Sequence, residues 1–507
     1  MALKDLLKNL PEVKPPVEKK LSFNVKLKWT LIVLAAFFIL ANIRLYGITT
    51  GALERFEYLA IILGTEFGSI ISLGIGPIVM ASIILQLLVG SKILNIDVKS
   101  EEGKKFFQGL QKLLVFFFVI FEAAVYVLMG GIAALPGYTA IVVLQLIIGG
   151  LLIVFMDEVT TKWGFGSGVS LFIVAGVAWR LFTELFQFIT QQGANCLLNL
   201  ETVCPGKIWV LFKSVINSDA SGALTAVAII VITAIIYLAV VWAQSLKVEI
   251  PLSFDRLRGY NIKWPMAFFY ASVIPVILTA ALVANIQLFA GLNSGVVTNC
   301  VNQISVNQSL IDNIRLENSI SNDTQIPMKT IVNYCSTGAK VAYKFIWLGT
   351  FSEGTRQPES GFAFWIAPTN LINLIIAKSA GWKYLFQGIF HTLFYMIFSV
   401  IFAVFWVKTA GMDAGSQAKN LLASGLQIPG FRKDERILET ILARYVLPLT
   451  IMGGAAIGLL ASIADILGAI ISGTSILLAV MIVYQFYQNI AQQHSVDMHP
   501  GLRKMMS

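Results

Sequence analysis

The residues best suited to covalent chemistry are four cysteines, Cys196, Cys204, Cys300 and Cys335. They fall in two polar stretches, 190–221 and 291–386, and none of them lies in an apolar segment. An even number of cysteines confined to loops is typical of disulfides formed in an oxidising compartment. We predict one local pair in each stretch, Cys196 with Cys204 and Cys300 with Cys335.

The sequence offers only weak candidates for a metal site, a nucleotide site or a catalytic site. The cysteines lack CxxC spacing, and the three histidines lie elsewhere in the chain, at His391, His494 and His499. Gly103-Lys104 and Gly206-Lys207 lack both the upstream glycine and the following Ser or Thr of a phosphate-binding loop. We therefore predict no metal, no cofactor and no enzymatic activity.

Few ionisable residues are expected to lie within the bilayer; they are Glu122, Arg180, Glu184 and Asp465. An ion-coupled transporter usually carries carboxylates near the middle of the membrane. The two apolar segments that contain a central proline consist mainly of Ile, Val and Leu. A pathway with aliphatic walls suits a hydrophobic constriction better than a site for an ion or a polar solute.

The composition identifies an integral membrane protein, because 57% of the 507 residues are hydrophobic and only 13% are charged. The lysine-rich start is followed by the apolar run Leu31–Ile43 without a small-residue cleavage site, which predicts a retained first helix. The net charge of +9 is compatible with nucleic acid or anionic lipid as a partner. The ordinary excess of Lys and Arg in cytoplasmic loops explains it equally well.

Ten apolar runs approach the ~20 residues that a spanning helix requires. They are 28–46, 69–91, 108–130, 138–157, 168–189, 222–244, 266–290, 387–408, 444–467 and 471–490. Placing both termini in the cytoplasm leaves about two-thirds of the 37 Lys and Arg on that side, as the positive-inside rule demands. This orientation exports both cysteine-bearing stretches, and the sequons at Asn307 and Asn322 permit glycosylation there.

These runs divide the chain into two halves of five helices, so the halves would have opposite topology. The predicted parts are a cytoplasmic segment 1–27, a first half 28–190, an external loop 191–221, a second half 222–490 and a cytoplasmic tail 491–507. The second half includes a long external loop, 291–386.

The second helix of each half contains residues that break helices. Ser69–Gly90 carries Gly74, Gly76 and Pro77, and 266–290 carries Pro275. Interrupted helices at matching positions indicate an inverted repeat around a pathway, although an ordinary kinked helix in a bundle is the alternative for one of them alone. A short amphipathic piece before the first of them, Leu53–Gly64, cannot span the membrane.

Two cytoplasmic connections are unusually long and basic. The first, 246–264, holds Lys247, Arg256, Arg258 and Lys263. The second, 409–443, holds Lys419, Arg432, Lys433 and Arg436. Such loops could bind RNA phosphates or anionic lipid headgroups, or their charges could only fix the topology.

The ordered motifs of the whole chain resemble the SecY family, the large subunit of the protein-conducting channel, in its archaeal-type branch. The matching stretches are Leu27–Thr30, Leu73–Val79, Gln86–Leu88, Phe107–Gly109, Gln111–Leu114, Gly166–Gly168, Lys247–Leu252, Ile274–Ile277, Ala284–Leu288 and Gly430–Lys433. The resemblance implies an all-α polytopic membrane protein with ten transmembrane helices in two inverted five-helix halves around a central pore. The loop 291–386 departs most from the family.

The resemblance also implies site residues. An aliphatic ring would close the pore, formed by Ile75, Val79, Val169, Ile173, Ile277 and Leu478. A plug helix, 53–65, would cover the ring with Leu53, Phe56, Leu59 and Ile62. Polar residues on a lateral gate would be Gln111, Glu122 and Asn285. The ribosome would be bound by Lys247, Arg256, Arg258, Arg432 and Lys433.

The implied function is passage of unfolded secretory polypeptides across the plasma membrane and lateral release of transmembrane helices into lipid. The implied partners are SecE and a beta subunit, the ribosome and its rRNA, signal sequences and nascent chains, and the signal recognition particle receptor. A ten-helix secondary transporter is the alternative, since an inverted repeat with broken helices fits it too. Scarce midplane carboxylates and two large basic loops favour the channel.

Overall fold

The computed structural model is mostly helical. The residues that it describes are 10–17, 21–48, 68–90, 93–94, 96, 101–128, 132, 134–188, 195–196, 204–254, 261–272, 274–283, 286–287, 290, 347–351, 358–379, 381–423, 426–427 and 434–498. The predicted plug, 53–65, and the cysteines Cys300 and Cys335 lie outside these ranges.

Eight helices of the described ranges are long and apolar enough to cross a membrane. These eight spans correspond to α2 (Phe23–Asn42), α5 (Glu101–Leu128), α6 (Thr139–Trp163), α7 (Gly168–Phe186), α9 (Ala220–Ser245), α15 (Trp382–Thr409), α17 (Glu435–Leu467) and α18 (Gly473–Met498). Each coincides with one of the ten predicted spans. The chain is therefore a multi-pass membrane protein, and the count of ten stays a prediction.

The two remaining predicted spans carry shorter apolar helices, α4 (Gly76–Gly90) and a helix over Ile274–Val283. We expected their prolines to bend a long helix. Instead, Pro77 and Pro275 each take the second position of a helix that begins there. The missing proline N–H removes no hydrogen bond in a first turn, so proline starts these helices. A series of tight turns, including Gly74 at φ +55°, precedes α4.

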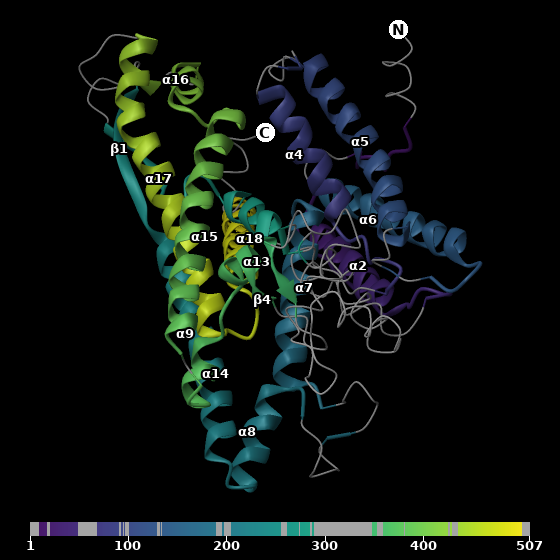
Figure 1. Ribbon diagram of the computed structural model, residues 1–507. Coiled ribbons are helices and arrows are strands. Elements are labelled where there is room, and N and C mark those ends of the chain that lie inside the picture. Colours follow the sequence, from purple (N-terminus) through teal and green to yellow (C-terminus); the bar gives the residue numbers. More distant parts are fainter. Residues whose placement is uncertain are drawn as a thin grey trace, which may run out of the picture.

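The helices form two groups with α7 and α18 between them (Figure 1). In this view α2, α4, α5 and α6 lie on one side and α9, α15 and α17 on the other. Helices α15 and α17 pack closely against each other, because Gly454 and Gly458 let the two backbones approach. A Cβ atom on Gly458 would come within 2.7 Å of the Tyr395 carbonyl oxygen. One large apolar cluster joins both groups.

From Lys247 on, the described residues of the first predicted cytoplasmic loop, 246–264, belong to two paired strands and depart from the expected all-helical structure. Strand β1 (Lys247–Phe254) pairs antiparallel with β2 (Asn261–Ala267). Residues alternate between polar and apolar along β1, so that Ile250 is buried while Lys247 is exposed. This period of two is the pattern of a half-buried strand.

Strand β5 (Leu426–Gln427), from the second predicted loop, extends this sheet in the order β2-β1-β5. The pairing partners are Ser253 with Gln427 and Phe254 with Leu426. A short helix, α16 (Ala414–Ala423), packs against α17 in the same region. The two basic connections, far apart in sequence, therefore meet in one sheet.

The described chain also contains several shorter elements. They are α8 (Lys207–Ile216), α13 (Gly361–Ile366), α14 (Leu371–Ile376) and a small pair of strands, β3 (Thr350–Phe351) and β4 (Pro358–Ser360). Helix α8 leads directly into α9 and packs against it, and α14 packs against α9 as well.

Candidate pore and lateral gate

The six predicted ring residues come from four segments of the fold. Ile75 lies in the turns before α4, and Val79 lies in the first turn of that helix. Val169 and Ile173 lie in the first two turns of α7, whereas Ile277 and Leu478 belong to the second half of the chain. All six are part of the same apolar cluster, in which Ile75, Ile173 and Leu478 are buried and the other three pack against the buried members.

The start of α7 is fixed by contacts with α6. The Val169 backbone N–H donates a hydrogen bond to Asp157 Oδ1 at 2.9 Å. Gly168 permits this approach, because a Cβ atom there would lie 2.6 Å from the Asp157 Cα atom. Sequence reasoning did not select Asp157, although its position near the end of an apolar run, 11 residues before Gly168, marks it as a polar group with a structural partner.

One predicted gate residue joins two neighbouring helices. Gln111 of α5 donates from Nε2 to the Ser82 hydroxyl of α4 at 2.9 Å. Glu122, on the same helix as Gln111, is half-buried. Asn285 lies outside the described residues. The structure therefore places two of the three predicted gate residues, Gln111 and Glu122, on one helix and does not describe the third.

The chain that leaves the predicted plug segment is anchored to the end of α2. The Leu45 N–H donates to the Gly68 carbonyl at 2.8 Å, and the Ile70 N–H donates to the Ile43 carbonyl at 2.9 Å. Gly68 has φ +90°, and its N–H donates to the Ser72 hydroxyl. Residues 53–65, with Leu53, Phe56, Leu59 and Ile62, lie outside the described ranges.

Of the five predicted ribosome-binding residues, the structure describes only Lys247, which is exposed at the start of β1. Arg256, Arg258, Arg432 and Lys433 lie in segments outside the described residues. The strands beside those segments are the ones that pair, β1 with β5. On the same sheet, Lys263 forms an exposed ion pair with Glu249 at 2.7 Å.

An N-terminal strap, residues 10–16, lies against the C-terminal end of α6. Lys162 of α6 forms an ion pair with Glu12 and donates to the Val13 carbonyl at 2.6 Å. The Val13 N–H donates to Glu158 Oε2 at 2.9 Å, and Glu158 also pairs with Lys112 of α5. These partners are about 150 residues apart in sequence, so no local pattern could have revealed them.

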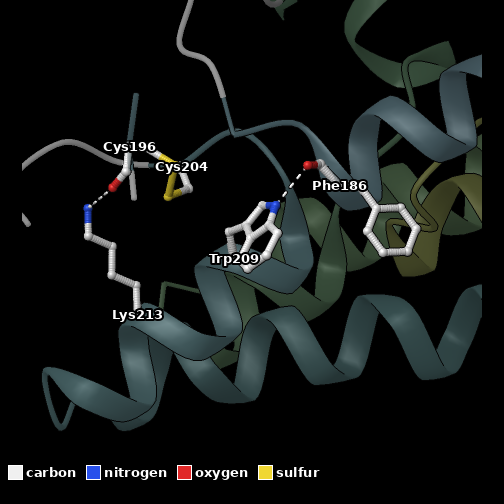
Figure 2. Close-up of a disulfide and its surroundings, with 5 residues drawn as sticks. All are labelled: Phe186, Cys196, Cys204, Trp209 and Lys213. Atoms are coloured by element: carbon white, nitrogen blue, oxygen red, sulfur yellow. Dashed lines mark hydrogen bonds between the residues drawn. A yellow bond between two sulfur atoms is a disulfide. The ribbon is translucent and has the colours of Figure 1, made fainter. Parts of the chain in front are cut away.

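The predicted disulfide between Cys196 and Cys204 is present (Figure 2). Both cysteines are buried, and their Cα atoms are 5.3 Å apart. Lys213 of α8 donates to the Cys196 carbonyl at 3.1 Å, and Trp209 of the same helix donates from Nε1 to the Phe186 carbonyl at 2.7 Å. The loop and the end of α7 therefore fix the position of α8.

Asp465 has a structural contact that bears on ion coupling. Its Oδ1 accepts a hydrogen bond from the Gly473 N–H at 2.7 Å and so ties α17 to the start of α18. Its other oxygen lies 4.0 Å from His391 Nε2. His391 Nδ1 lies 2.7 Å from the Ile366 carbonyl oxygen, which can only accept, so this nitrogen carries the proton.

The SecY family model matches residues 69–487 of the chain. Among curated proteins, the protein translocase subunit SecY of Methanothermobacter thermautotrophicus is 39% identical over 98% of this chain and 96% of its own length. That of Pyrococcus horikoshii is 35% identical with the same coverage.

Solved structures agree with the sequence relatives. A protein-conducting channel aligns with a TM-score of 0.70 at 33% identity over 98% of both chains. Sec61 in the canine ribosome-channel complex from the endoplasmic reticulum aligns with a TM-score of 0.68 at 32% identity, also over 98% of both chains. The family match, the full-length relatives and the aliphatic cluster joining two groups of membrane helices show that the chain belongs to the SecY family.

Proposed function

We propose that this chain is the pore-forming subunit of a Sec translocon, a passive channel for unfolded polypeptides. Its relatives are protein translocase subunits, and the structures that it matches are protein-conducting channels and a ribosome-bound channel. A bound partner such as the ribosome drives transport, and membrane segments of the substrate leave sideways into lipid. A passive channel of this kind needs no catalytic residue.

The observation that carries the proposal is the single apolar cluster to which all six ring residues belong. Each of the six is aliphatic, so the ring offers no charge or hydrogen bond to hold an ion or a translocating chain. Aliphatic side chains can exclude water when packed together and yield to a polypeptide that passes between them. The ring is thus a seal that opens for a large, flexible substrate.

Two further elements complete the channel. Segment 53–65 is the plug beside the ring, and its exit is held by the hydrogen bonds of Leu45 and Ile70. The α4–α5 contact between Ser82 and Gln111 lies on the lateral gate, together with Glu122 and Asn285.

The sheet β2-β1-β5 forms the base of the ribosome-docking surface. The pairing of β1 with β5 supports this role, because it brings the loop with Arg256 and Arg258 and the loop with Arg432 and Lys433 to adjacent strands. Arginine and lysine on such loops bind rRNA phosphates in a salt-dependent manner. The signal recognition particle receptor delivers the ribosome to this side, and both termini are cytoplasmic.

The remaining assignments follow from the family. SecE and a beta subunit complete a heterotrimer in the plasma membrane. The alternative, a secondary transporter, is disfavoured because few carboxylates lie within the predicted spans, and one of them, Asp465, ties α17 to the start of α18. A coupling carboxylate must be available to bind and release an ion or a proton.

The seal can be tested in liposomes that contain the purified heterotrimer. Replacing Ile75 and Ile277 with Ala removes side-chain volume from the ring, so we expect small-ion leakage to increase at least severalfold. The matched control replaces the lipid-exposed Ile235 and Ile397 with Ala and leaves leakage unchanged. Equal leakage in both variants would contradict the seal. Failure of the unmodified trimer to protect a ribosome-bound precursor from protease would contradict the channel.

A further inference from the structure

Two helices that carry predicted ring residues, α7 and α18, begin with the same pattern. Both starts read Ser-Gly-x-Ser, at 167–170 and 472–475. In each, the hydroxyl of the first serine accepts a hydrogen bond from the backbone N–H of the second serine at 3.4 Å. A ring residue stands five positions after each glycine, Ile173 in α7 and Leu478 in α18. The two starts are therefore matching positions in the two halves of the chain.

An aspartate from the end of the preceding helix holds each start. Asp157 of α6 accepts from the Val169 N–H, and Asp465 of α17 accepts from the Gly473 N–H at 2.7 Å. The start of α18 also lies directly against α17, because the Ala461 carbonyl occupies the space that a Cβ atom on Gly473 would need. Asp465 is thus the counterpart of Asp157 and holds the helix that carries Leu478.

The two aspartates differ in their surroundings. Asp157 is half-buried, whereas the side chain of Asp465 is 5% exposed. The second oxygen of Asp465, Oδ2, lies 4.0 Å from Nε2 of His391 on α15, whose side chain is fully buried. Neither of these two atoms has a hydrogen-bond partner among the described residues. Buried polar atoms nearly always have a partner, so this facing pair requires an explanation.

The other nitrogen of the imidazole uses its hydrogen elsewhere. His391 Nδ1 donates to the Ile366 carbonyl at 2.7 Å, and Gln387, one turn earlier on α15, donates to the Phe364 carbonyl at 2.8 Å. Both contacts satisfy carbonyl groups in the last turn of α13. A neutral imidazole has only one N–H, so Nε2 is then an acceptor and faces a carboxylate oxygen, which is also an acceptor. Two buried acceptors without a donor are unfavourable.

One additional proton turns this opposition into a hydrogen bond. Either an imidazolium donates to the carboxylate, or a carboxylic acid donates to the neutral imidazole. In both cases the same single proton lies between Nε2 and Oδ2 and belongs to the pair. The separation of 4.0 Å is too long for a hydrogen bond, and we expect the proton to shorten it to about 2.7–2.9 Å.

No other charge within the described ranges competes for this pair. The neighbouring helices without a charged residue are α4, α9, α13, α14 and the one over Ile274–Val283. On α17 and α18 the next residues that can carry a charge near neutral pH, Arg444 and His494, lie about 30 Å away along the axis. Lys419 of α16 pairs with Glu435 at the far end of α17, and Lys383 of α15 is exposed.

We propose that His391 and Asp465 bind one proton between them, and that this shared proton fixes the start of α18 and so positions the ring residue Leu478. The inference rests on the proposed seal and adds a positioning pair to it. Contacts then run without a break from α13 through α15 and α17 to α18. The proton is held rather than transported, because both side chains are buried and Asp465 keeps its bond to Gly473.

The proton can be detected by ¹⁵N NMR of the imidazole. The chain has three histidines, so replacing His494 and His499 with Gln leaves His391 as the single reporter in a labelled subunit assembled with unlabelled partners. We expect Nε2 to carry or share a hydrogen, and to become a bare acceptor in Asp465→Leu. The same Nε2 resonance in both proteins would overturn the shared proton.

The phenol of Tyr395 is the other group that could supply a hydrogen, since its ring lies 4.7 Å from the His391 ring. Tyr395→Phe should leave the Nε2 resonance as it is. A bare Nε2 in this variant would assign the hydrogen to the phenol and overturn the shared proton.

Hydrogen exchange in the intact trimer tests the positioning role. Asp465→Leu should speed exchange in the first turn of α18 roughly tenfold, the loss typical of a charged hydrogen bond. Asp465→Asn should stay slow, because its amide can donate to Nε2 while its oxygen accepts from Gly473. The control Gln387→Leu removes a contact to α13 from the same helix and should also stay slow. Fast exchange in Asp465→Asn, or equal rates in Asp465→Leu and Gln387→Leu, would overturn the role.

A third variant applies if Asp465→Leu does not assemble. His391→Phe leaves Asp465 in place without its proton-sharing partner and should speed the same exchange severalfold. Unchanged exchange would show that Asp465 holds α18 without the proton and would overturn the proposal.

Ion leakage separates this inference from the proposed function. Asp465→Leu should leak several times faster than the unmodified trimer in liposomes, as the ring variant with Ala at positions 75 and 277 does. If the ring variant leaks and Asp465→Leu does not, the pair does not position the seal. If the ring variant itself does not leak, the seal is wrong, and the resonance and exchange measurements still decide whether the proton is shared and holds α18.

Discussion

The carboxylate of Asp157 accepts a hydrogen bond from the backbone N–H of Val169, with 2.9 Å between Oδ1 and the nitrogen. This contact fixes the first turn of α7 against α6. The same turn carries one predicted ring residue, and Ile173 follows one turn later. The position of two ring residues thus depends on a half-buried polar group that belongs to neither the ring nor the substrate path.

Replacing Asp157 with Ala should loosen this side of the seal. Loss of a side chain that caps a helix start costs about 1 kcal/mol, and here the freed turn carries Val169. We expect the resting channel to leak ions several times faster in planar bilayers. Asp157→Asn keeps an acceptor oxygen and should leak much less.

A matched control uses Asp434, which accepts from the Arg436 N–H at the start of α17 and is remote from the ring in the fold. Asp434→Ala removes the same kind of contact but should leave the leak unchanged. If Asp157→Ala and Asp434→Ala leak equally, the start of α7 has no special part in the seal.

The contact between Gln111 and Ser82 should hold α4 and α5 together as one wall of the lateral gate. One hydrogen bond is worth about 1 kcal/mol net, so its loss should change the ratio of open to closed channels by no more than roughly fivefold. Gln111→Leu and Ser82→Ala should each increase translocation of a precursor with a weakened signal sequence by up to this factor. In the double variant the effect should not increase further, because both changes remove one interaction. Fully additive effects would show that the two residues act separately.

The disulfide should stabilise α8 locally. Its cysteines are eight residues apart, and closing so short a loop is worth about 2–3 kcal/mol in the chain-entropy account. Reduction should therefore speed amide hydrogen exchange in α8 by roughly thirty- to one-hundred-and-sixtyfold. A Cys196→Ser, Cys204→Ser variant should exchange at the fast rate with or without reductant. Slow exchange in that variant would mean that Trp209 and Lys213 hold the helix without the disulfide.

The N-terminal strap should detach in acid. The hydrogen bond from Lys162 holds the pKa of Glu12 below its ordinary value of 4.5. A carboxylate with a lowered pKa in the folded state stabilises the strap above pH 4.5 and loses this effect as the pH falls through the lowered pKa. Exchange of the Val13 amide hydrogen should accelerate in that range, after correction for intrinsic rates. Glu12→Gln should remove this part of the pH dependence, and an unchanged profile would contradict the role of the pair.

The sequence predicts the long helices well, because each is an uninterrupted apolar run. It places helix starts poorly where proline is involved, since Pro77 reads as a break within a span and in fact follows the first residue of α4. The hairpin β1–β2 was missed because a basic connection was expected there, although the alternation from Lys247 to Ile250 carries the strand signal. The strap could not be predicted, because an ion pair such as Glu12 with Lys162 joins residues 150 positions apart and leaves no local pattern.

The candidate site, too, could be predicted only in part. Ring residues could be proposed from motif positions, because the seal requires only aliphatic side chains at defined places along the helices. The polar groups that hold the helices in place, such as Asp157 at the start of α7 and Ser82 at the contact with Gln111, become visible only when the helices are packed together. Their importance comes from a partner on another helix rather than from their own chemistry.

Crosslinking of a translocating chain tests the channel most directly. Photoreactive residues at positions 75, 79 and 277 are combined with a stalled ribosome-bound secretory precursor, and position 238, where Leu238 is 69% exposed to lipid, serves as the control. We predict crosslinks from the three ring positions to the precursor and none from position 238. If the ring positions never react with a precursor that has been engaged and is protected from protease, these side chains do not line the path, and the proposed pore is wrong.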